Sequence, residues 1–393
     1  MLKTIGRVAL IFFLYFIIQS LYTGVTTTPS EGDSVYYHIP LAHHFLDGGF
    51  IRADYGDKFH YFFPASTETL LSILIVFGLP LNIFNLLAMV CLFLSSYRLG
   101  LRVNLGTSLA VIFGVSVSLV MTVSRWALAQ TVDIWLAVYY FLSLQILLKK
   151  KIETLDYLWL GIAMGLLVGS KYSGLAFTAI LGIIFWRKWF HTLTIKKVVL
   201  FLIPFLLVGV SWYVRNWVAV GNPFYPLHTS LFPGLPGLIP TQVGDAIVAF
   251  PISMLNAYIS EYMVWSVLVV LLFFLLLLPK IRNRVTSLEW SLLGLSVGNF
   301  MVFLCLPSGD SYQLHVSQFR FSYVVFMPMI LVLFILAKKL KLEKVLGVIA
   351  LANLFLLPPL AYSPKLLFVY IPLATVVFFW EETSRYFHRT VAS

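Results

Sequence analysis

Residues 1–24, MLKTIGRVALIFFLYFIIQSLYTG, begin the chain with a basic end followed by an apolar run. The run has roughly the 20 residues that a helix needs to cross a bilayer. It is not followed by a small-residue cleavage motif, so the sequence predicts an uncleaved first membrane span. Because positive charge prefers the cytoplasmic side of a span, Lys3 and Arg7 indicate a cytoplasmic N-terminus.

The same apolar character continues along all 393 residues. Hydrophobic residues make up 60% of the chain and charged residues only 11%, whereas soluble domains carry about 25% charged residues. Unbroken apolar runs of about 20 residues favour helices, since the strands of a membrane β-barrel alternate over about ten. The sequence therefore predicts an all-α, polytopic helical membrane protein with one transmembrane domain over residues 1–393.

Clusters of basic residues set the predicted topology. If the second span runs inward over residues 81–96, the later spans alternate between the two faces, giving about twelve spans in all. Most of the 27 Lys and Arg residues then lie on the cytoplasmic side and most of the 16 acids on the other. Both termini are predicted to be cytoplasmic, with two long outer segments at 31–80 and 215–262.

A polar stretch interrupts the apolar chain at residues 31–68, EGDSVYYHIPLAHHFLDGGFIRADYGDKFHYFFPASTE. So apolar a chain keeps this many titratable groups only where water or a substrate meets them. The helix that begins at Pro64 is predicted to lie along the membrane surface. The first outer segment is therefore the predicted location of the chemistry.

Basic residues also stand at predicted outer span ends, on the face that the positive-inside pattern disfavours: Arg125, Lys171, Arg215 and Arg320. Lys and Arg are the usual phosphate ligands, so a shared anion at the outer surface would explain them. Contact with lipid headgroups is the alternative for any single one of the four. We favour a shared site.

Local motifs accompany these residues in a fixed order. They are Gly32-Asp33-Ser34-Val35-Tyr36-Tyr37, Tyr61-Phe62-Phe63-Pro64, Thr131-Val132-Asp133, Gly169-Ser170-Lys171-Tyr172, Trp212-Tyr213-Val214-Arg215-Asn216-Trp217, Gly221-Asn222-Pro223-Phe224-Tyr225-Pro226 and Arg320-Phe321. In order, spacing and membrane side they resemble the GT-C superfamily of integral-membrane glycosyltransferases, in the branch of protein O-mannosyltransferases and aminoarabinose transferases. The resemblance covers about residues 7–336.

The resemblance implies a transferase that moves a sugar from a polyprenyl-phosphate donor to an acceptor at the outer membrane face. Asp33 matches the family's first-loop acid, the expected general base, and Asp133 matches the second-loop acid. An acceptor hydroxyl needs a nearby carboxylate, and a phosphate leaving group needs fixed positive charge. The candidate substrate-binding residues are Tyr37, His38, Lys58, His60, Tyr61, Arg125, Lys171, Tyr172, Arg215, Asn216 and Arg320.

The sequence also departs from the family pattern. The aminoarabinose branch has a lysine directly before the proline of the juxtamembrane helix, where this chain has Phe63. Lys58 and His60 are the nearest bases that could meet the phosphate. No large soluble outer domain is recognisable, so we expect a glycan, lipid or small acceptor, together with membrane lipids and no nucleic acid, as partners.

Other interpretations of the same residues stay open. Asp33 and Asp133 each precede a helical stretch and could be N-caps, and Glu68 is expected to cap or hydrate the juxtamembrane helix. The histidines of the first outer segment could bind a divalent metal with Asp33, but no short-spaced ligand motif is present. We therefore favour solvated histidines and assign no metal site.

The alternative function is a membrane transporter, or a flippase or polymerase of lipid-linked glycans. Transporters place charged residues near the bilayer midplane, often in interrupted helices. The ionisable residues of this chain collect instead at predicted span ends, which argues against transport. The Gly-rich phosphate loop of soluble nucleotide enzymes is absent, so a cytosolic nucleotide sugar is a poor donor candidate.

Overall fold

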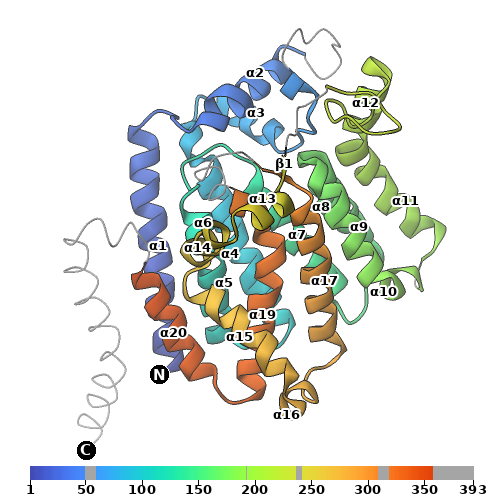
Figure 1. Ribbon diagram of the computed structural model, residues 1–393. Coiled ribbons are helices and arrows are strands. Elements are labelled where there is room, and N and C mark those ends of the chain that lie inside the picture. The colour runs from blue at the N-terminus through green and yellow to red at the C-terminus, as the bar shows by residue number, and fades with distance from the viewer. Residues whose placement is uncertain (49–58, 192, 236–240, 309–317, 357–393) are drawn as a thin grey trace, which may run out of the picture.

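The computed structural model describes residues 1–48, 59–191, 193–235, 241–308 and 318–356. Helices form almost all of its regular structure (Figure 1). Within the described ranges the strands are β1 (Thr241–Gln242) and β2 (Pro307–Ser308), which pair antiparallel over two residues each. The regular structure of these ranges is therefore helical apart from this short pairing.

Five helical segments in the described ranges are long and apolar enough to cross a membrane. They are α1 (Leu2–Thr26), η3 with α4 (Leu81–Arg102), α11 with η4 and α12 (Ile195–Val220), α17 (Ser287–Leu304), and η5 with α19 (Phe319–Lys339). The pair α13 (Val243–Ala249) and α14 (Pro251–Tyr262), bent by 115°, makes a sixth if it is counted as one broken span. These are the helices of a multi-pass membrane protein.

Other apolar helices are shorter than the roughly 20 residues of a full crossing. They are α5 (Thr107–Ser118), α7 (Asp133–Leu147), α8 (Thr154–Ser170), α9 (Tyr172–Ile184) and α15 (Val264–Leu277). The predicted number of about twelve spans is therefore not confirmed by helix length. The part of the chain assigned to the last two predicted spans lies mostly outside the described residues.

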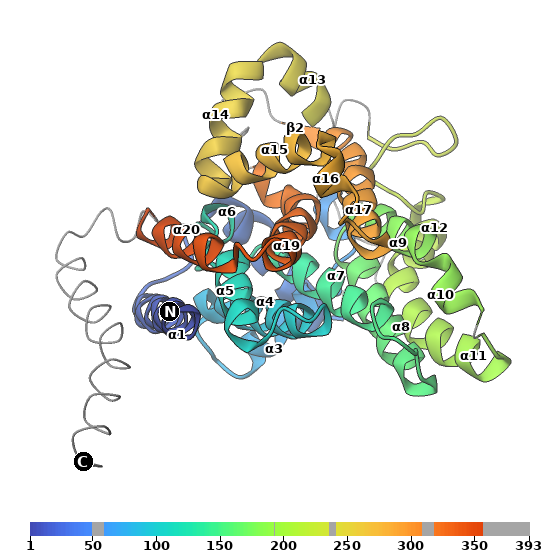
Figure 2. The same ribbon diagram turned by 90° about the horizontal axis from the view of Figure 1, so that it is seen from below.

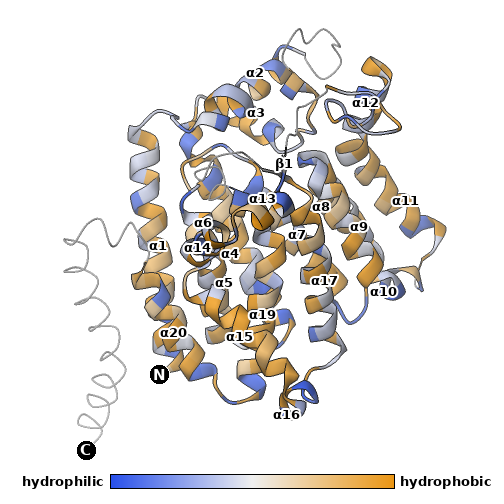
Figure 3. Ribbon diagram, in the orientation of Figure 1, coloured by the Kyte–Doolittle hydropathy of each residue, from blue (hydrophilic) through white to orange (hydrophobic). Residues whose placement is uncertain are grey.

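Eight further helical elements lie in the described ranges. They are η1 (Ser34–His38), α2 (Ile39–Leu46), η2 (Phe59–Phe62), α3 (Glu68–Val76), α6 (Met121–Ser124), α10 (Trp186–Phe190), α16 (Pro279–Arg282) and α20 (Glu343–Phe355). In Figure 1, α2, α3 and α12 lie at the end opposite to the N-terminus, α10 and α16. The helices between are mostly hydrophobic along their length (Figure 3).

Side-chain caps set where α8 and α17 begin. The Glu153 N–H donates to Asp156 at 2.9 Å, and the Thr286 N–H donates to Glu289 at 2.6 Å. Each capping acid also pairs with a lysine, Asp156 with Lys149 and Glu289 with Lys339. A carboxylate in the first helical turn satisfies backbone donors that have no partner within the helix, so these pairs define the two helix starts.

Glycines let α8 lie directly against α11 and η4 (Phe205–Val210). Gly161, Gly165 and Gly169 follow one another at four-residue spacing on α8. A Cβ at Gly161 would lie 2.3 Å from the Phe201 carbonyl oxygen, and one at Gly169 would lie 2.4 Å from that of Val208. Small residues at this spacing allow backbones to pack closely in membrane helices. The packing fixes the C-terminal end of α8, which borders the polar segment.

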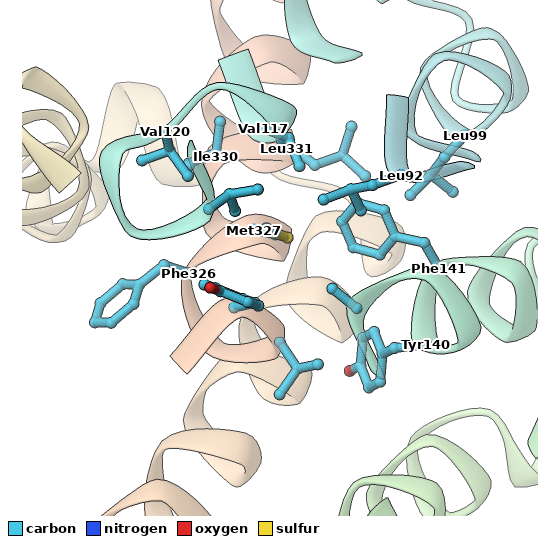
Figure 4. Packing of buried hydrophobic residues seen from close by; sticks show 14 of the residues in the cluster. Leu92, Leu99, Val117, Val120, Tyr140, Phe141, Phe326, Met327, Ile330 and Leu331 are labelled. Carbon is cyan, nitrogen blue, oxygen red and sulfur yellow. The ribbon is translucent and has the colours of Figure 1, made fainter. Parts of the chain in front are cut away.

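The helix α19 occupies the centre of the fold. It is buried along most of its length, and the view from below places it among α5, α7 and α17 (Figure 2). Its Met327, Ile330 and Leu331 pack with residues of α4, α5 and α7 (Figure 4). Because η5 immediately precedes α19, Arg320 stands at the end of this central helix.

Candidate active site

Four ionisable side chains from distant parts of the chain meet at helix ends. Asp33 precedes the π-helical turn η1, Asp133 begins α7, Lys171 joins α8 to α9, and Arg320 lies in η5. We call these four residues the charge cluster. The structure brings together both predicted catalytic acids and two of the four predicted outer cations.

The charge cluster is a continuous chain of opposite charges. Lys171 Nζ donates to Asp133 Oδ1 at 2.7 Å, and Arg320 Nε lies 3.4 Å from Asp133 Oδ2. Arg320 also donates through Nη2 to Asp33 Oδ2. Two carboxylates and two cations thus alternate in the order Asp33, Arg320, Asp133, Lys171, and their formal charges cancel.

Side-chain exposure differs among the four residues of the charge cluster. The Asp133 side chain is 5% exposed and that of Arg320 12%, whereas those of Lys171 and Asp33 are 31% and 48% exposed. The two inner members are therefore enclosed, and the two outer members face accessible space. Among the four residues, Asp33 and Lys171 offer the most accessible surface to a ligand.

Burial and neighbouring charge act on the protonation of both accessible residues. Burial alone raises the pKa of the Asp33 carboxyl, but the nearby Arg320, with His38 and Lys171, holds that pKa below its ordinary value. Burial lowers the pKa of the Lys171 ammonium, and Asp133 offsets only part of this effect. Asp33 is thus ionised at neutral pH, while Lys171 loses its proton more readily than a free lysine.

Aromatic rings surround the cations of the charge cluster. Lys171 Nζ lies 3.7 Å from the ring centre of Phe321, and the Arg320 guanidinium lies 4.9 Å from the ring of Trp126. Such contacts stabilise partly desolvated cations. The cavity between Asp133, Arg320 and Phe321 has a volume of about 10 Å³, room for about one water. This cavity is too small to hold a ligand of the size of a sugar phosphate.

A second set of predicted residues, from α9 and α12, forms a hydrogen-bonded group beside the cluster. Asn216 Nδ2 donates to the Phe62 carbonyl at 2.7 Å, and the Tyr172 hydroxyl lies 2.5 Å from the Tyr225 carbonyl oxygen. Arg215 donates to Asn216 Oδ1 at 2.8 Å. These contacts hold η2 against α12, and they fix the residue that follows Lys171.

The aromatic and histidine candidates of the first outer segment pack together. The Tyr37 ring centre lies 4.0 Å from that of His38 and 5.7 Å from that of His60, while Tyr61 stacks on His44 at 4.4 Å. Burial, and then the nearby carboxylates of which Glu68 is the first, raise the pKa of Tyr37. Tyr37 therefore lies between this group and the charge cluster. Lys58 lies outside the described residues.

The expected common site for all four outer cations is not formed by direct contacts. Lys171 and Arg320 belong to the charge cluster, but Arg125 Nη2 pairs with Glu261 Oε1 at 2.6 Å. Glu261 is fully buried on α14, and a buried carboxylate needs such a partner. Arg125 therefore anchors α14, and Arg215 belongs to the Asn216 group.

Sequence reasoning missed several residues that position the cluster. The Gln130 N–H donates to Ser34 Oγ at 2.8 Å, which ties the Asp33 segment to the loop before α7. Glu68 is neither a hydrated residue nor a side-chain cap; it is buried against His38. The pairing of Glu261 could have been predicted from the sequence, since Glu261 is a single acid within an otherwise apolar stretch and a buried acid needs a partner.

Metal ligation has no structural support in the described part of the chain, where no group of three His, Cys, Asp or Glu side chains could hold an ion. Asp33 and Asp133 each have a cationic partner there. A divalent ion would have to displace a cation to use either carboxylate.

Comparisons of the chain with protein-family models, with curated proteins and with solved structures found no match. The activity of this protein is therefore inferred from the charge cluster and its surroundings.

Proposed function

We propose that this protein is a membrane glycosyltransferase of the GT-C type, which moves a sugar from a polyprenyl-phosphate donor to an acceptor hydroxyl. The observation that carries the proposal is the charge cluster, in which two acids and two cations from segments far apart in the sequence share one chain of contacts. Both charge types are needed for this reaction, because a proton leaves the acceptor while negative charge grows on the phosphate.

The roles follow from exposure and contact. Asp33 is ionised and half exposed, so it can take the proton from the acceptor hydroxyl. The acceptor oxygen then attacks the anomeric carbon, and the bond from that carbon to the phosphate oxygen breaks with its electron pair on the phosphate. Lys171 and Arg320 stabilise this leaving group. Asp133 contacts both cations and holds them in place.

We further propose the predicted topology of about twelve spans, with both termini in the cytoplasm and the charge cluster on the outer face. The short helices α10 and α16, which carry Arg187, Lys188, Lys280 and Arg282, lie at the same end as the N-terminus, opposite α2 and α3 (Figure 1). A lipid-borne donor cannot leave the membrane, and a site at its surface can meet both donor and acceptor.

The positions of the four residues favour transfer over transport. Asp133, Lys171 and Arg320 each stand at the end of a helix or between two helices, and Asp33 lies in the first polar segment. Transport proteins use charged residues near the middle of their spans. Movement of an intact lipid-linked sugar is therefore the alternative outcome of the experiment below.

The test uses purified protein in liposomes that contain polyprenyl-phosphate sugars, and it measures released polyprenyl phosphate. Asp33→Asn should lower the rate by about 10²- to 10⁴-fold, the usual contribution of a general base. The control is Asp156→Asn, which alters another ion-paired acid at the opposite end of α8 and should transfer normally. Normal transfer by Asp33→Asn, or transbilayer movement of uncleaved donor, would contradict the proposal.

A further inference from the structure

A second buried ionisable pair lies beside the charge cluster and has no role in the proposed reaction so far. His38 Nδ1 lies 2.8 Å from Glu68 Oε1, and the two side chains are 5% and 0% exposed. Glu68 Oε2 has no hydrogen-bond partner among the described residues. Burying a carboxylate with a single partner costs free energy, and α3 does not need Glu68 as a cap. A functional role of this pair would account for that cost.

The contact with Glu68 decides which nitrogen of His38 is basic. A carboxylate accepts hydrogen bonds, so the proton of a neutral His38 belongs on Nδ1, and the lone pair stays on Nε2. A carboxylate that holds one ring nitrogen in this way also stabilises the imidazolium that forms when the other takes a proton. His38 is thus prepared to accept a proton at Nε2.

The local backbone places His38 next to Asp33. Asp33 immediately precedes the π-helical turn Ser34–His38, in which the Ile39 N–H bonds the Ser34 carbonyl five residues earlier. The two side chains are close enough for a positive charge on His38 to favour the ionised Asp33 carboxylate. Such π-helical turns often occur at functional sites. The turn therefore sets the proposed base and the histidine at its two ends.

The same pair is also joined to the far end of the charge cluster. Thr67, which precedes Glu68, has its Oγ1 2.5 Å from Ser170 Oγ, and Ser170 precedes Lys171. Ser72, one turn further along α3, donates to the Ala42 carbonyl at 2.9 Å and fastens α3 to α2. Glu68 is therefore held in place from two sides, independently of His38.

We propose that Glu68 is a positioning residue that orients His38, and that His38 Nε2 receives the proton which Asp33 removes from the acceptor hydroxyl. This inference rests on the proposed function. The acceptor proton moves first to the Asp33 carboxylate and then to Nε2, which leaves Asp33 ionised and His38 as an imidazolium facing Glu68. The imidazolium returns its proton to water, so the cycle neither gains nor loses charge.

The pH profile of transfer distinguishes this relay from a structural role. An already protonated His38 cannot accept a proton, so the rate should fall on the acidic side. Glu68→Gln keeps an acceptor for Nδ1 but removes the charge that stabilises the imidazolium. It should move this acidic limb to lower pH and slow the plateau rate about tenfold, whereas His38→Gln should remove the limb.

Other groups around His38 must be accounted for in that profile. They are Glu68 of α3, Asp33 and Tyr37 of its own turn, His60 of η2, Tyr139 of α7 and, beyond Asp33, Arg320. Ser72→Ala is the matched control, because it removes the hydroxyl that bonds the Ala42 and Glu68 backbone carbonyls while it leaves both side chains of the pair unchanged. It should leave the acidic limb where it is.

A second measurement follows the protonation of His38 in the His38–Glu68 pair without any substrate. Nitrogen-15 NMR of histidine-labelled protein in lipid, with His38→Gln to identify the signal, should show neutral His38 protonated at Nδ1. Its titration midpoint should fall in Glu68→Gln. A midpoint and an acidic limb that Glu68→Gln leaves unchanged would overturn the relay while Asp33→Asn still abolishes transfer. A wild-type protein without transfer activity would instead overturn the proposed function and the relay with it.

Discussion

Asp33 and Arg320 form an ion pair at the start of α19 although 287 positions separate them in the chain. Arg320 also approaches Asp133, so its charge is fully engaged before any ligand arrives. The charge cluster has no surplus cation, and Asp33 is its most exposed acid. Under the proposed mechanism, a donor phosphate would therefore compete with Asp33 for Arg320, and donor binding would free the carboxylate that is proposed to accept the proton.

This competition predicts that Asp33→Asn binds an anionic headgroup more tightly while it loses transfer. A half-exposed ion pair contributes up to about 1 kcal/mol, so dodecyl phosphate should bind about two- to fivefold more tightly to the variant. Fluorescence or calorimetric titration in neutral detergent measures the affinity. Asp156→Asn serves as the control. Weaker binding by Asp33→Asn would show that Asp33 does not compete for Arg320.

The low pKa of Asp33 predicts how acid affects stability. A carboxyl whose pKa is lowered by folding adds stability above its ordinary value of 3.8, and that stability is lost as the pH falls through the lowered pKa. The contribution is small because Asp33 is half exposed. Thermal unfolding followed below about pH 5 should therefore show a shallower loss for Asp33→Asn than for the wild type. Parallel curves would contradict the pairing.

The lowered pKa of Lys171 predicts that anion binding weakens at alkaline pH. Burial lowers its pKa below 10.5, so the ammonium becomes neutral earlier than in a free lysine. Dodecyl phosphate is fully ionised above about pH 8, and a change in affinity beyond that pH reports on the protein. In the wild type, affinity should begin to fall at a lower pH than a free lysine would give, but it should stay level in Lys171→Arg, whose guanidinium remains charged. A fall that persists in Lys171→Arg would exclude this role for Lys171.

The glycine packing of α8 predicts a steric effect on folding. Gly161→Val would place carbon atoms within 2.3 Å of the Phe201 carbonyl oxygen, and crowding of this kind costs about 1–3 kcal/mol or more. We expect a lower unfolding temperature, or loss of the monodisperse peak in size-exclusion chromatography. Gly32→Ala, where no atom lies within 4 Å, is the matched control. Equal stability of both variants would disprove the close approach of α8 and α11.

Much of the candidate site can be predicted from the sequence, because few residues of so apolar a chain are charged. Lys171 and Arg320 were predicted from their place at outer span ends, and Asp33 and Asp133 from the resemblance to the GT-C superfamily. The four residues meet in the structure. Their ion-pair partners could not be predicted from the sequence. Which cation Asp33 takes depends on which helices are neighbours, and the sequence pattern carries no information on that.

Helix lengths were the weaker part of the prediction, for a similar reason. Hydropathy alone predicts one span over the apolar run from Leu105 to Val123, but α5 ends at Ser118 and Val120 has an extended backbone. The residues at this break are themselves apolar, so hydropathy cannot detect it. In the segment Ile195–Val220, Pro204 lacks the backbone donor that a regular helix needs, and a π-helical stretch follows it.

The most direct test of the central proposal is a cryo-electron microscopy map of the protein in lipid nanodiscs that contain a polyprenyl phosphate. We predict phosphate density within about 3 Å of Lys171 and Arg320, with the Asp33 carboxylate turned away from the guanidinium. A map in which Asp33 still holds Arg320, and in which the phosphate occupies only another surface, would contradict it.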